Sequence, residues 1–167
     1  VPERICVGLA AALLERPDDE PYADLLLDRI VRANLLLMPL EGEGGWYRFH
    51  PLFRDLLLRH LRLTYARAQM QAFQLRAAQW LDQARLYAEA LRLYLAADQV
   101  DAAGALVERM LQRELGRDLA TAPPTYWLNQ LPADLIARRP GLALLAARIG
   151  SFQMDVAGAL AHLERVD

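Results

Sequence analysis

The spacing of hydrophobic residues changes along the chain, and the change predicts two kinds of structure. Near the N-terminus, apolar residues recur every four positions from Ile5 to Leu13, which predicts a helix over residues 4–15. A charged, proline-containing stretch follows, and a second amphipathic pattern predicts a helix over residues 22–34. Both predicted helices are short enough to belong to a small domain.

A different pattern follows and predicts a β-hairpin. Residues 35–40 form a short apolar run, residues 41–45 are rich in glycine, and residues 46–50 are rich in aromatic side chains. Two short apolar or aromatic runs separated by a glycine-containing turn are typical of a hairpin.

The hairpin is followed by a third predicted helix, which continues to about Leu63. Pro51 suits the first turn of a helix, where its missing N–H group costs no hydrogen bond. Leu52, Leu56 and Leu63 lie on one side of this helix. Residues 1–64 are therefore predicted to form one domain.

After Thr64 the pattern is helical throughout, so residues 65–167 are predicted to form a second, all-helical domain. Glycine and proline residues mark the breaks between helices. Helices are predicted over residues 67–83, 86–97, 99–115, 125–130, 133–138, 141–152 and 155–166. The predicted fold class is mainly α, with one small β-hairpin.

Small residues in this second part indicate an internal repeat. Ala77 precedes the segment 88–91 by eleven positions, and Ala146 precedes the segment 157–160 by the same eleven. The two sets lie 69 positions apart, which is close to twice the period of about 34 residues of tetratricopeptide repeats. This favours an α-helical, tetratricopeptide-like array. Chance recurrence in an alanine-rich chain remains the alternative.

Composition narrows the possible functions. The net charge of −2 provides no overall basic field for nucleic acid or anionic lipid. The single cysteine, Cys6, and the lack of an apolar run of about 20 residues favour a cytoplasmic protein that does not enter the membrane. All 19 basic residues are arginine, so these residues cannot supply a phosphate-loop or Schiff-base lysine.

No catalytic or metal-binding constellation is predicted. The three histidines, His50, His60 and His162, have no cysteine or carboxylate partner at a spacing typical of metal ligands. The one serine, Ser151, lacks the sequence context of a nucleophile. The chain is therefore expected not to be an enzyme.

Two segments carry a resemblance to a known family. Residues 32–40, RANLLLMPL, and residues 46–57, WYRFHPLFRDLL, resemble the winged-helix end of the ATPase module in large LuxR-type regulators related to MalT. These regulators belong to the STAND class of signal-transduction ATPases. The helical segment that follows in the family is resembled by residues 77–81, 88–91, 96–98, 127–132 and 139–142.

The resemblance implies a domain organisation. Residues 1–64 are expected to be the winged-helix module, the C-terminal part of a STAND ATPase unit. Residues 65–167 are expected to be the N-terminal portion of a helical sensor array. A nucleotide-binding domain that binds ATP or ADP would precede the segment, and a DNA-binding helix-turn-helix would lie at the far C-terminus. One difference from the family is Arg85, which stands in a turn where glycine is common.

The same resemblance implies a nucleotide-contacting residue in the intact protein. It implies no cofactor that residues 1–167 would bind by themselves. His50 is expected to contact the β-phosphate of ADP in the resting state of the intact protein; the alternative is a histidine bonded to the local backbone. The residues themselves also suggest a phosphate patch of Arg48, Arg54, Arg59 and Arg62 with His60. Such side chains more often form a solvated face or pair with acids such as Asp55. The alternative is contact with the nucleotide-binding domain, for which Arg48 and Arg54 are the candidates.

The helical part is expected to receive a small-molecule inducer or a protein partner. Its aromatic side chains could stack on a sugar ring, although aromatic residues at helical spacing are more often part of a core. These candidates are Trp80, Tyr87, Tyr94, Tyr126 and Trp127.

Three functions are compatible with these patterns. The first is a regulatory coupling segment of an ATP-dependent transcription regulator, and the second is a tetratricopeptide-like interaction scaffold. The third, a DNA-binding winged helix, is disfavoured because Asp24 and Asp28 lie on the would-be reading helix and Glu41 and Glu43 at the wing tip. No direct contact with nucleic acid is therefore expected.

Overall fold

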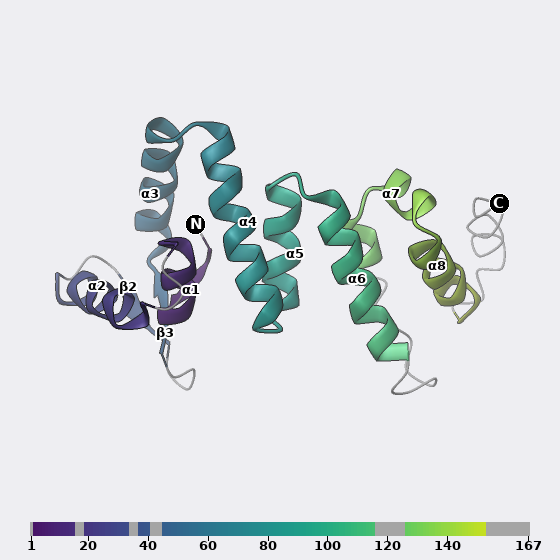
Figure 1. The fold of residues 1–167 in the computed structure, drawn as a ribbon, viewed down its shortest axis with the longest axis horizontal. Coiled ribbons are helices and arrows are strands. Elements are labelled where there is room, and N and C mark those ends of the chain that lie inside the picture. Colours follow the sequence, from purple (N-terminus) through teal and green to yellow (C-terminus); the bar gives the residue numbers. More distant parts are fainter. Residues whose placement is uncertain (1, 16–18, 34–36, 41–44, 116–125, 153–167) are drawn as a thin grey trace. The chain divides into compact units, whose positions relative to one another are not determined.

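The chain forms two compact units, Val1–Asp98 (unit 1) and Gln99–Asp167 (unit 2). The computed structural model describes residues 2–15, 19–33, 37–40, 45–115 and 126–152 (Figure 1). The described residues are mainly α-helical with one small antiparallel sheet, which confirms the predicted fold class. No described helix has the length and apolar character needed to cross a membrane.

The sheet of unit 1 has three short strands in the order β1-β3-β2. They are β1 (Arg4–Cys6), β2 (Leu37–Pro39) and β3 (Trp46–Phe49), and both pairings are antiparallel. The second and third strands confirm the predicted hairpin. The first strand corrects the predicted helix over residues 4–15, because Ile5 pairs with Tyr47 of β3 and the helix begins only at Val7.

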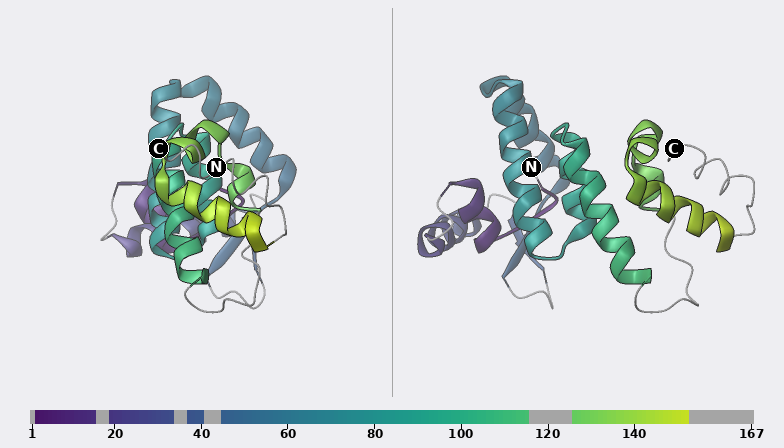
Figure 2. Two further views of the ribbon diagram at one scale, coloured as in Figure 1. Left: turned by 90° about the vertical axis from the view of Figure 1, so that its right-hand side faces the viewer. Right: turned by 45° about the vertical axis from the view of Figure 1, so that its right-hand side comes forward.

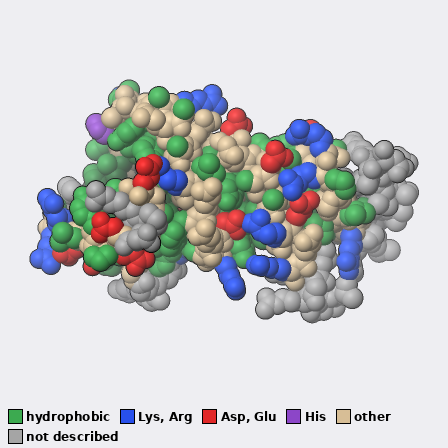
Figure 3. All heavy atoms as spheres, viewed as in Figure 1, with side chains coloured by type: hydrophobic (Ala, Val, Ile, Leu, Met, Phe, Trp, Pro, Cys, Tyr) green, Lys and Arg blue, Asp and Glu red, His purple; other side chains and the backbone are tan. Residues whose placement is uncertain are grey.

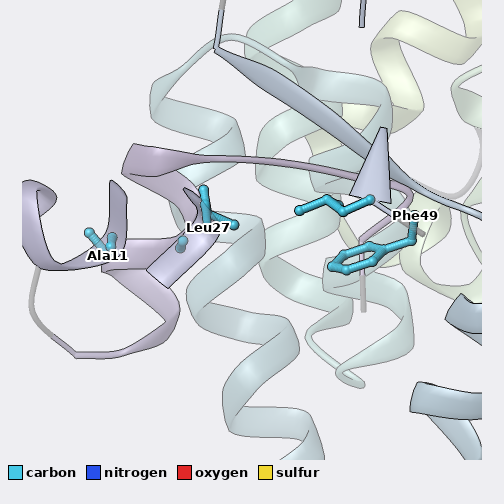
Figure 4. Packing of buried hydrophobic residues seen from close by; sticks show 6 residues of the cluster. Ala11, Leu27 and Phe49 are labelled. Atoms are coloured by element: carbon cyan, nitrogen blue, oxygen red, sulfur yellow. The ribbon is translucent and has the colours of Figure 1, made fainter. Parts of the chain in front are cut away.

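Helices α1 (Val7–Leu13) and α2 (Glu20–Arg32) cover the sheet and form a common core with it. Asp19 caps α2 by accepting a hydrogen bond from the N–H of Tyr22 at 3.2 Å. Ala11, Leu27 and Phe49 bring buried side chains from α1, α2 and β3 into one cluster (Figure 4). This cluster fixes the end of β3, from which the next helix starts.

Helix α3 (Pro51–Thr64) does not pack through the side that carries Leu52, Leu56 and Leu63. These three leucines are 75%, 60% and 80% exposed. Phe53 and Leu57 pack against the core cluster instead. The helix carries leucines on two faces, and the position of the sheet decides which face packs. Hydrophobic side chains remain at the surface over α3 (Figure 3).

Helices α4 (Arg67–Gln83) and α5 (Tyr87–Ala96) run side by side as an antiparallel pair (Figures 1 and 2). Ala77, Ala78 and Ala90 are almost fully buried, which lets two helices approach closely. These are residues on which the repeat prediction rests, although a repeat itself stays a prediction. The segment 157–160, which carries its second copy, lies outside the described residues.

The turn between these helices uses Arg85 in a left-handed conformation, with φ +62°. The N–H of Arg85 donates to the carbonyl of Asp82 at 3.0 Å, and that of Leu86 donates to the carbonyl of Leu81 at 2.8 Å. This pair of bonds is the Schellman arrangement, which satisfies the last carbonyls of a helix and favours glycine at the left-handed position. The turn therefore keeps its geometry although arginine replaces the usual glycine.

Unit 2 contains helices around its own core. Its described elements are α6 (Val100–Leu115), a 3₁₀ turn η1 (Leu128–Gln130), α7 (Ala133–Arg138) and α8 (Pro140–Phe152). Arg139 donates to Glu108 at 2.7 Å, and a Cβ added at Gly104 would lie 3.1 Å from Leu135, so α6 packs tightly against the chain around α7. The predicted helix over residues 155–166 lies outside the described residues. The division into domains 1–64 and 65–167 stays a prediction, since compactness alone does not decide it.

Candidate regulatory site at the start of helix α3

His50 stands where β3 ends and α3 begins. Its backbone is extended, with φ −56° and ψ 135°, and its carbonyl accepts the first helical hydrogen bond from the N–H of Arg54 at 2.9 Å. Pro51 fixes the first helical position, as its sequence predicts. These features hold the residue at the N-terminal end of the helix axis.

One nitrogen of the His50 imidazole forms no hydrogen bond with its described surroundings. Nδ1 is buried and has no hydrogen-bond partner among the described residues, and the side chain does not cap α3. Buried polar atoms are normally hydrogen-bonded, because an unsatisfied one costs about 1–3 kcal/mol. The first turn of α3 contains no acidic residue, so the positive end of the helix dipole is not offset there by a carboxylate. When Nδ1 carries the ring proton, an acceptor, and especially an anion, fits this arrangement.

The structure separates the two arginines that the sequence placed beside His50. Arg48 is exposed in the middle of β3, with Arg4 and Met38 opposite it on the neighbouring strands. Arg54 is half-buried and lines a recess of about 100 Å³ together with Glu3, Glu89 and Arg92. Arg48 is thus available to a partner outside unit 1, whereas Arg54 lies in a charged recess within it.

The remaining basic residues of α3 form no phosphate site with His50. Arg59 and Arg62 line an open hollow farther along the helix, with Asp55 and Leu63. His60 is exposed, and the hydroxyl of Thr64 donates to its carbonyl at 2.9 Å. Arg59, His60 and Arg62 are two or more helical turns from the start of α3.

A second cluster joins the sheet to the helical pair, and sequence analysis did not find it. Nε and Nη2 of Arg4 donate to Oε1 of Glu89 at 3.1 and 2.8 Å, and the guanidinium lies 4.6 Å from the centre of the Trp46 ring. Trp46 in turn meets the Trp80 ring edge-on, at 6.1 Å between centroids. Gly8 completes the cluster, because a Cβ there would lie only 2.9 Å from Trp80.

We call these five residues, Arg4, Gly8, Trp46, Trp80 and Glu89, the junction cluster. They come from β1, α1, β3, α4 and α5, so the cluster connects the sheet and α1 with the helical pair. The two tryptophans are the one signal that could have pointed to it. Nothing local in the sequence pairs residues 85 positions apart.

The aromatic candidates for sugar stacking do not share one site. Trp80 belongs to the junction cluster, and Tyr94 is buried with its hydroxyl 3.4 Å from Asp82. Tyr126 is exposed in unit 2, where its ring meets Trp127 edge-on. In the part of the chain that the structure describes, no group of three or more metal-ligating side chains is gathered.

Comparison with known proteins gives these features a context. Residues 1–70 match the family described as the MalT winged helix domain. The chain is 32% identical over 150 residues to the HTH-type transcriptional regulator MalT of Vibrio cholerae, covering 87% of this chain and 16% of that protein. It is 30% identical over 159 residues to the regulator of the same name from Yersinia enterocolitica, covering 93% of this chain and 17% of that protein. No solved structure matches it.

The chain thus spans about one sixth of the length of these relatives, and they are named as transcriptional regulators. The matched residues 1–70 contain the sheet, the first three helices and His50. The similarity to the regulators continues well beyond that domain, into the helical part. Residues 1–70 therefore belong to the MalT winged helix domain family, and nearly all of the chain is similar to one segment of MalT-named transcriptional regulators.

Proposed function

We propose that this chain is the coupling segment of an ATP-dependent, LuxR-type transcription regulator, in which the winged helix senses bound nucleotide and the helical part receives an inducer or partner signal. The observation that carries the proposal is the buried, unpartnered Nδ1 of His50 at the start of α3. The nucleotide would be bound by a domain of the longer protein, because this chain has no lysine and no glycine-rich phosphate loop.

In the resting state, Nδ1–H of His50 would donate to a phosphate oxygen of ADP. The helix N-terminus would add a favourable field to that contact. One hydrogen bond to a charged group contributes about 1.5–3 kcal/mol, which shifts a two-state equilibrium by about ten- to a hundred-fold. A single contact of this size is enough to favour an inactive arrangement while nucleotide diphosphate is bound.

The junction cluster supports the relay to the helical part. Arg4 and Trp46 belong to the winged-helix elements, and Glu89 and Trp80 belong to α5 and α4. Because these contacts lie inside one compact unit, a displacement of the winged helix would carry α4 and α5 with it. Arg48, exposed on β3, is the candidate for direct contact with the nucleotide-binding domain.

The test uses the full-length regulator and measures both the ADP dissociation rate and the thermal midpoint. His50→Ala should accelerate ADP release by about tenfold or more and raise transcription without inducer. His50→Asn should retain part of the effect, because its amide can place an N–H near the position of Nδ1. Arg59→Ala, on the same helix but away from His50, is the matched control and should leave ADP release unchanged.

A purely structural role for His50 gives a different result. In that case His50→Ala would lower the thermal midpoint, while the ADP dissociation rate and the basal output per folded molecule would match those of the parent protein. That pattern would refute the nucleotide contact.

The second candidate is an interaction scaffold of the tetratricopeptide type. The close antiparallel packing of α4 and α5 through Ala77, Ala78 and Ala90 favours it. A scaffold would bind its partner regardless of nucleotide. Binding of inducer or partner with the same affinity in the ADP and ATP states would therefore favour this candidate over the first.

Direct DNA reading is the function that the described residues favour least. On α2, Glu20 and Asp24 are exposed, and Asp28 pairs with Arg32 at 2.8 Å, which removes a cation from phosphate contact. The wing-tip residues Glu41 and Glu43 lie outside the described residues. Salt-sensitive, micromolar binding of duplex DNA in a fluorescence-anisotropy titration of this chain would overturn this prediction.

A further inference from the structure

We propose that unit 1 binds a small, neutral and mainly apolar molecule with one hydrogen-bonding end, in the cavity between α3 and α4. The cavity has a volume of about 390 Å³, and residues of β1, β3, α1, α5 and the segments that flank these elements supply the rest of its lining. Neither the nucleotide contact at His50 nor the junction cluster uses this space. The proposal therefore goes beyond the function described above.

The cavity is partly open to solvent, and its walls are mainly apolar. It could hold about thirteen water molecules at their volume in liquid water, but apolar walls give these waters few hydrogen bonds, so an apolar ligand would displace them readily. Its volume falls within the range of about 300–1,000 Å³ that is typical of small-molecule sites.

The lining defines the chemistry of the ligand. Leu57 and Leu61 contribute from α3, and Met70 and Phe73 contribute from α4. No arginine, aspartate or glutamate lines the cavity, so a charged ligand would be buried without a counter-ion. Three lining side chains carry polar groups that can bond a hydroxyl or carbonyl: His60, Tyr65 and Gln74.

The way α3 is held makes the cavity accessible. No residue of α3 is fully buried, and at its C-terminal end Tyr65 meets the ring of Phe73 edge-on at 5.2 Å between centroids. A ligand between α3 and α4 would contact both helices and bury more of the inner face of α3. Ligand binding would thus stabilise α3, the same helix that starts at His50.

The volume also favours a small molecule over a protein segment. A helix of about 10 Å diameter already fills about 420 Å³ in one turn of 5.4 Å, so the cavity could not admit more than about one turn. The exposed leucines Leu52, Leu56 and Leu63 do not line this cavity, so a protein docked on them would not fill it.

Methionine methyl groups provide the test. The chain has four methionines, and Met70 lines the cavity whereas Met38 is exposed on β2. The chain would be labelled with ¹³C-methyl methionine and titrated with 2-naphthol, a neutral fused ring with one hydroxyl. We expect a saturable shift of the Met70 signal and no shift of the Met38 signal.

Filling the cavity should abolish the response. Gln74→Phe places an aromatic ring in the space and should remove the saturable shift of Met70 while keeping or raising the thermal midpoint. Gln71→Phe, one turn earlier on the same helix and outside the lining, should bind 2-naphthol as the parent chain does. Leu61→Trp fills the cavity from the opposite wall and answers the same question if Gln74→Phe does not fold.

Three results would overturn the proposal. The first is an unmoved Met70 signal at saturating probe. The second is equal shifts of Met70 and Met38, or unchanged binding by a folded filled variant, since either means non-specific association. The third is a Met70 signal that changes with protein concentration without probe, together with a doubled mass, because a second copy would then occupy the cavity.

Discussion

The contact between Arg4 and Glu89 should contribute measurably to the stability of unit 1, although both residues are charged. Two guanidinium nitrogens donate to the same carboxylate oxygen, and the two side chains are only 21% and 23% exposed. Hydrogen bonds to charged groups contribute about 1.5–3 kcal/mol. Since about a fifth of each side chain still reaches water, we expect a coupling free energy near 1.5 kcal/mol, the lower end of that range.

A double-mutant cycle with Arg4→Met and Glu89→Ala would measure this coupling. Arg4→Met alone should cost more than Glu89→Ala alone, because it also removes the cation–π contact with Trp46, which is worth about 0.5–2 kcal/mol. Urea unfolding would be followed by tryptophan fluorescence in a Trp127→Phe background. The two remaining tryptophans, Trp46 and Trp80, both lie in unit 1 and contact each other.

The same segments provide the control. Glu3 pairs with Arg92 at 3.1 Å, so a second ion pair joins the start of the chain to α5, but these side chains are 63% and 52% exposed. Exposed ion pairs typically contribute about 0.2–1 kcal/mol, and we expect a coupling below about 0.5 kcal/mol here. Equal coupling in the two cycles, or no coupling between Arg4 and Glu89, would refute the reasoning that burial makes the first pair the stronger one.

Three further predictions concern single positions. Arg85→Gly should raise the stability of unit 1 by about 0.5–1 kcal/mol in urea unfolding, because a φ of +62° strains any residue but glycine. The control Ala84→Gly, at φ −73°, should lower the stability. A destabilised Arg85→Gly variant would contradict this prediction. Gly8→Ala should lower the thermal midpoint through a clash with Trp80, at a cost of about 1–3 kcal/mol. The same substitution should cost less in a Trp80→Phe background. If the stability losses of the two single variants add up in the double variant, the clash is not their cause. Burial raises the pKa of the Cys6 thiol above its ordinary value of 9.0. The contribution of this shift to the free energy of unfolding is therefore fully present below pH 9.0 and is lost as the pH rises through the raised pKa. Cys6→Ser should flatten this part of a profile of stability against pH, and an identical profile would disprove the reasoning.

Local sequence signals predicted the elements that depend on local structure. The fourth helix begins and ends at Arg67–Gln83, as its pattern predicts, and α8 begins within one residue of the prediction. Glycine, proline and aromatic residues were also enough to place the hairpin and the start of α3. His50 could be predicted as a candidate for the same reason, because adjacent residues in the sequence determine where the strand ends and the helix begins.

Features that depend on distant parts of the chain could not be predicted in this way. Arg4–Cys6 forms a strand only because β3 offers a free edge, and a four-residue apolar spacing carries no information about that edge. The leucines of α3 lie on two faces of the helix, so their spacing alone does not predict which face packs against the core. The unpartnered nitrogen of His50 is likewise a property of its three-dimensional surroundings.

The junction cluster limits how this segment can be exchanged between proteins. A winged helix transplanted without α4 and α5 would leave Trp46 and the guanidinium of Arg4 without the partners that cover them. A chimera joined after Thr64 would therefore tend to aggregate or unfold, whereas one joined after Asp98 would keep the contacts of unit 1 together. A segment can be exchanged without loss of stability only when both sides of such an interface are exchanged together. The winged helix and its first helical pair are therefore expected to be exchanged as one unit.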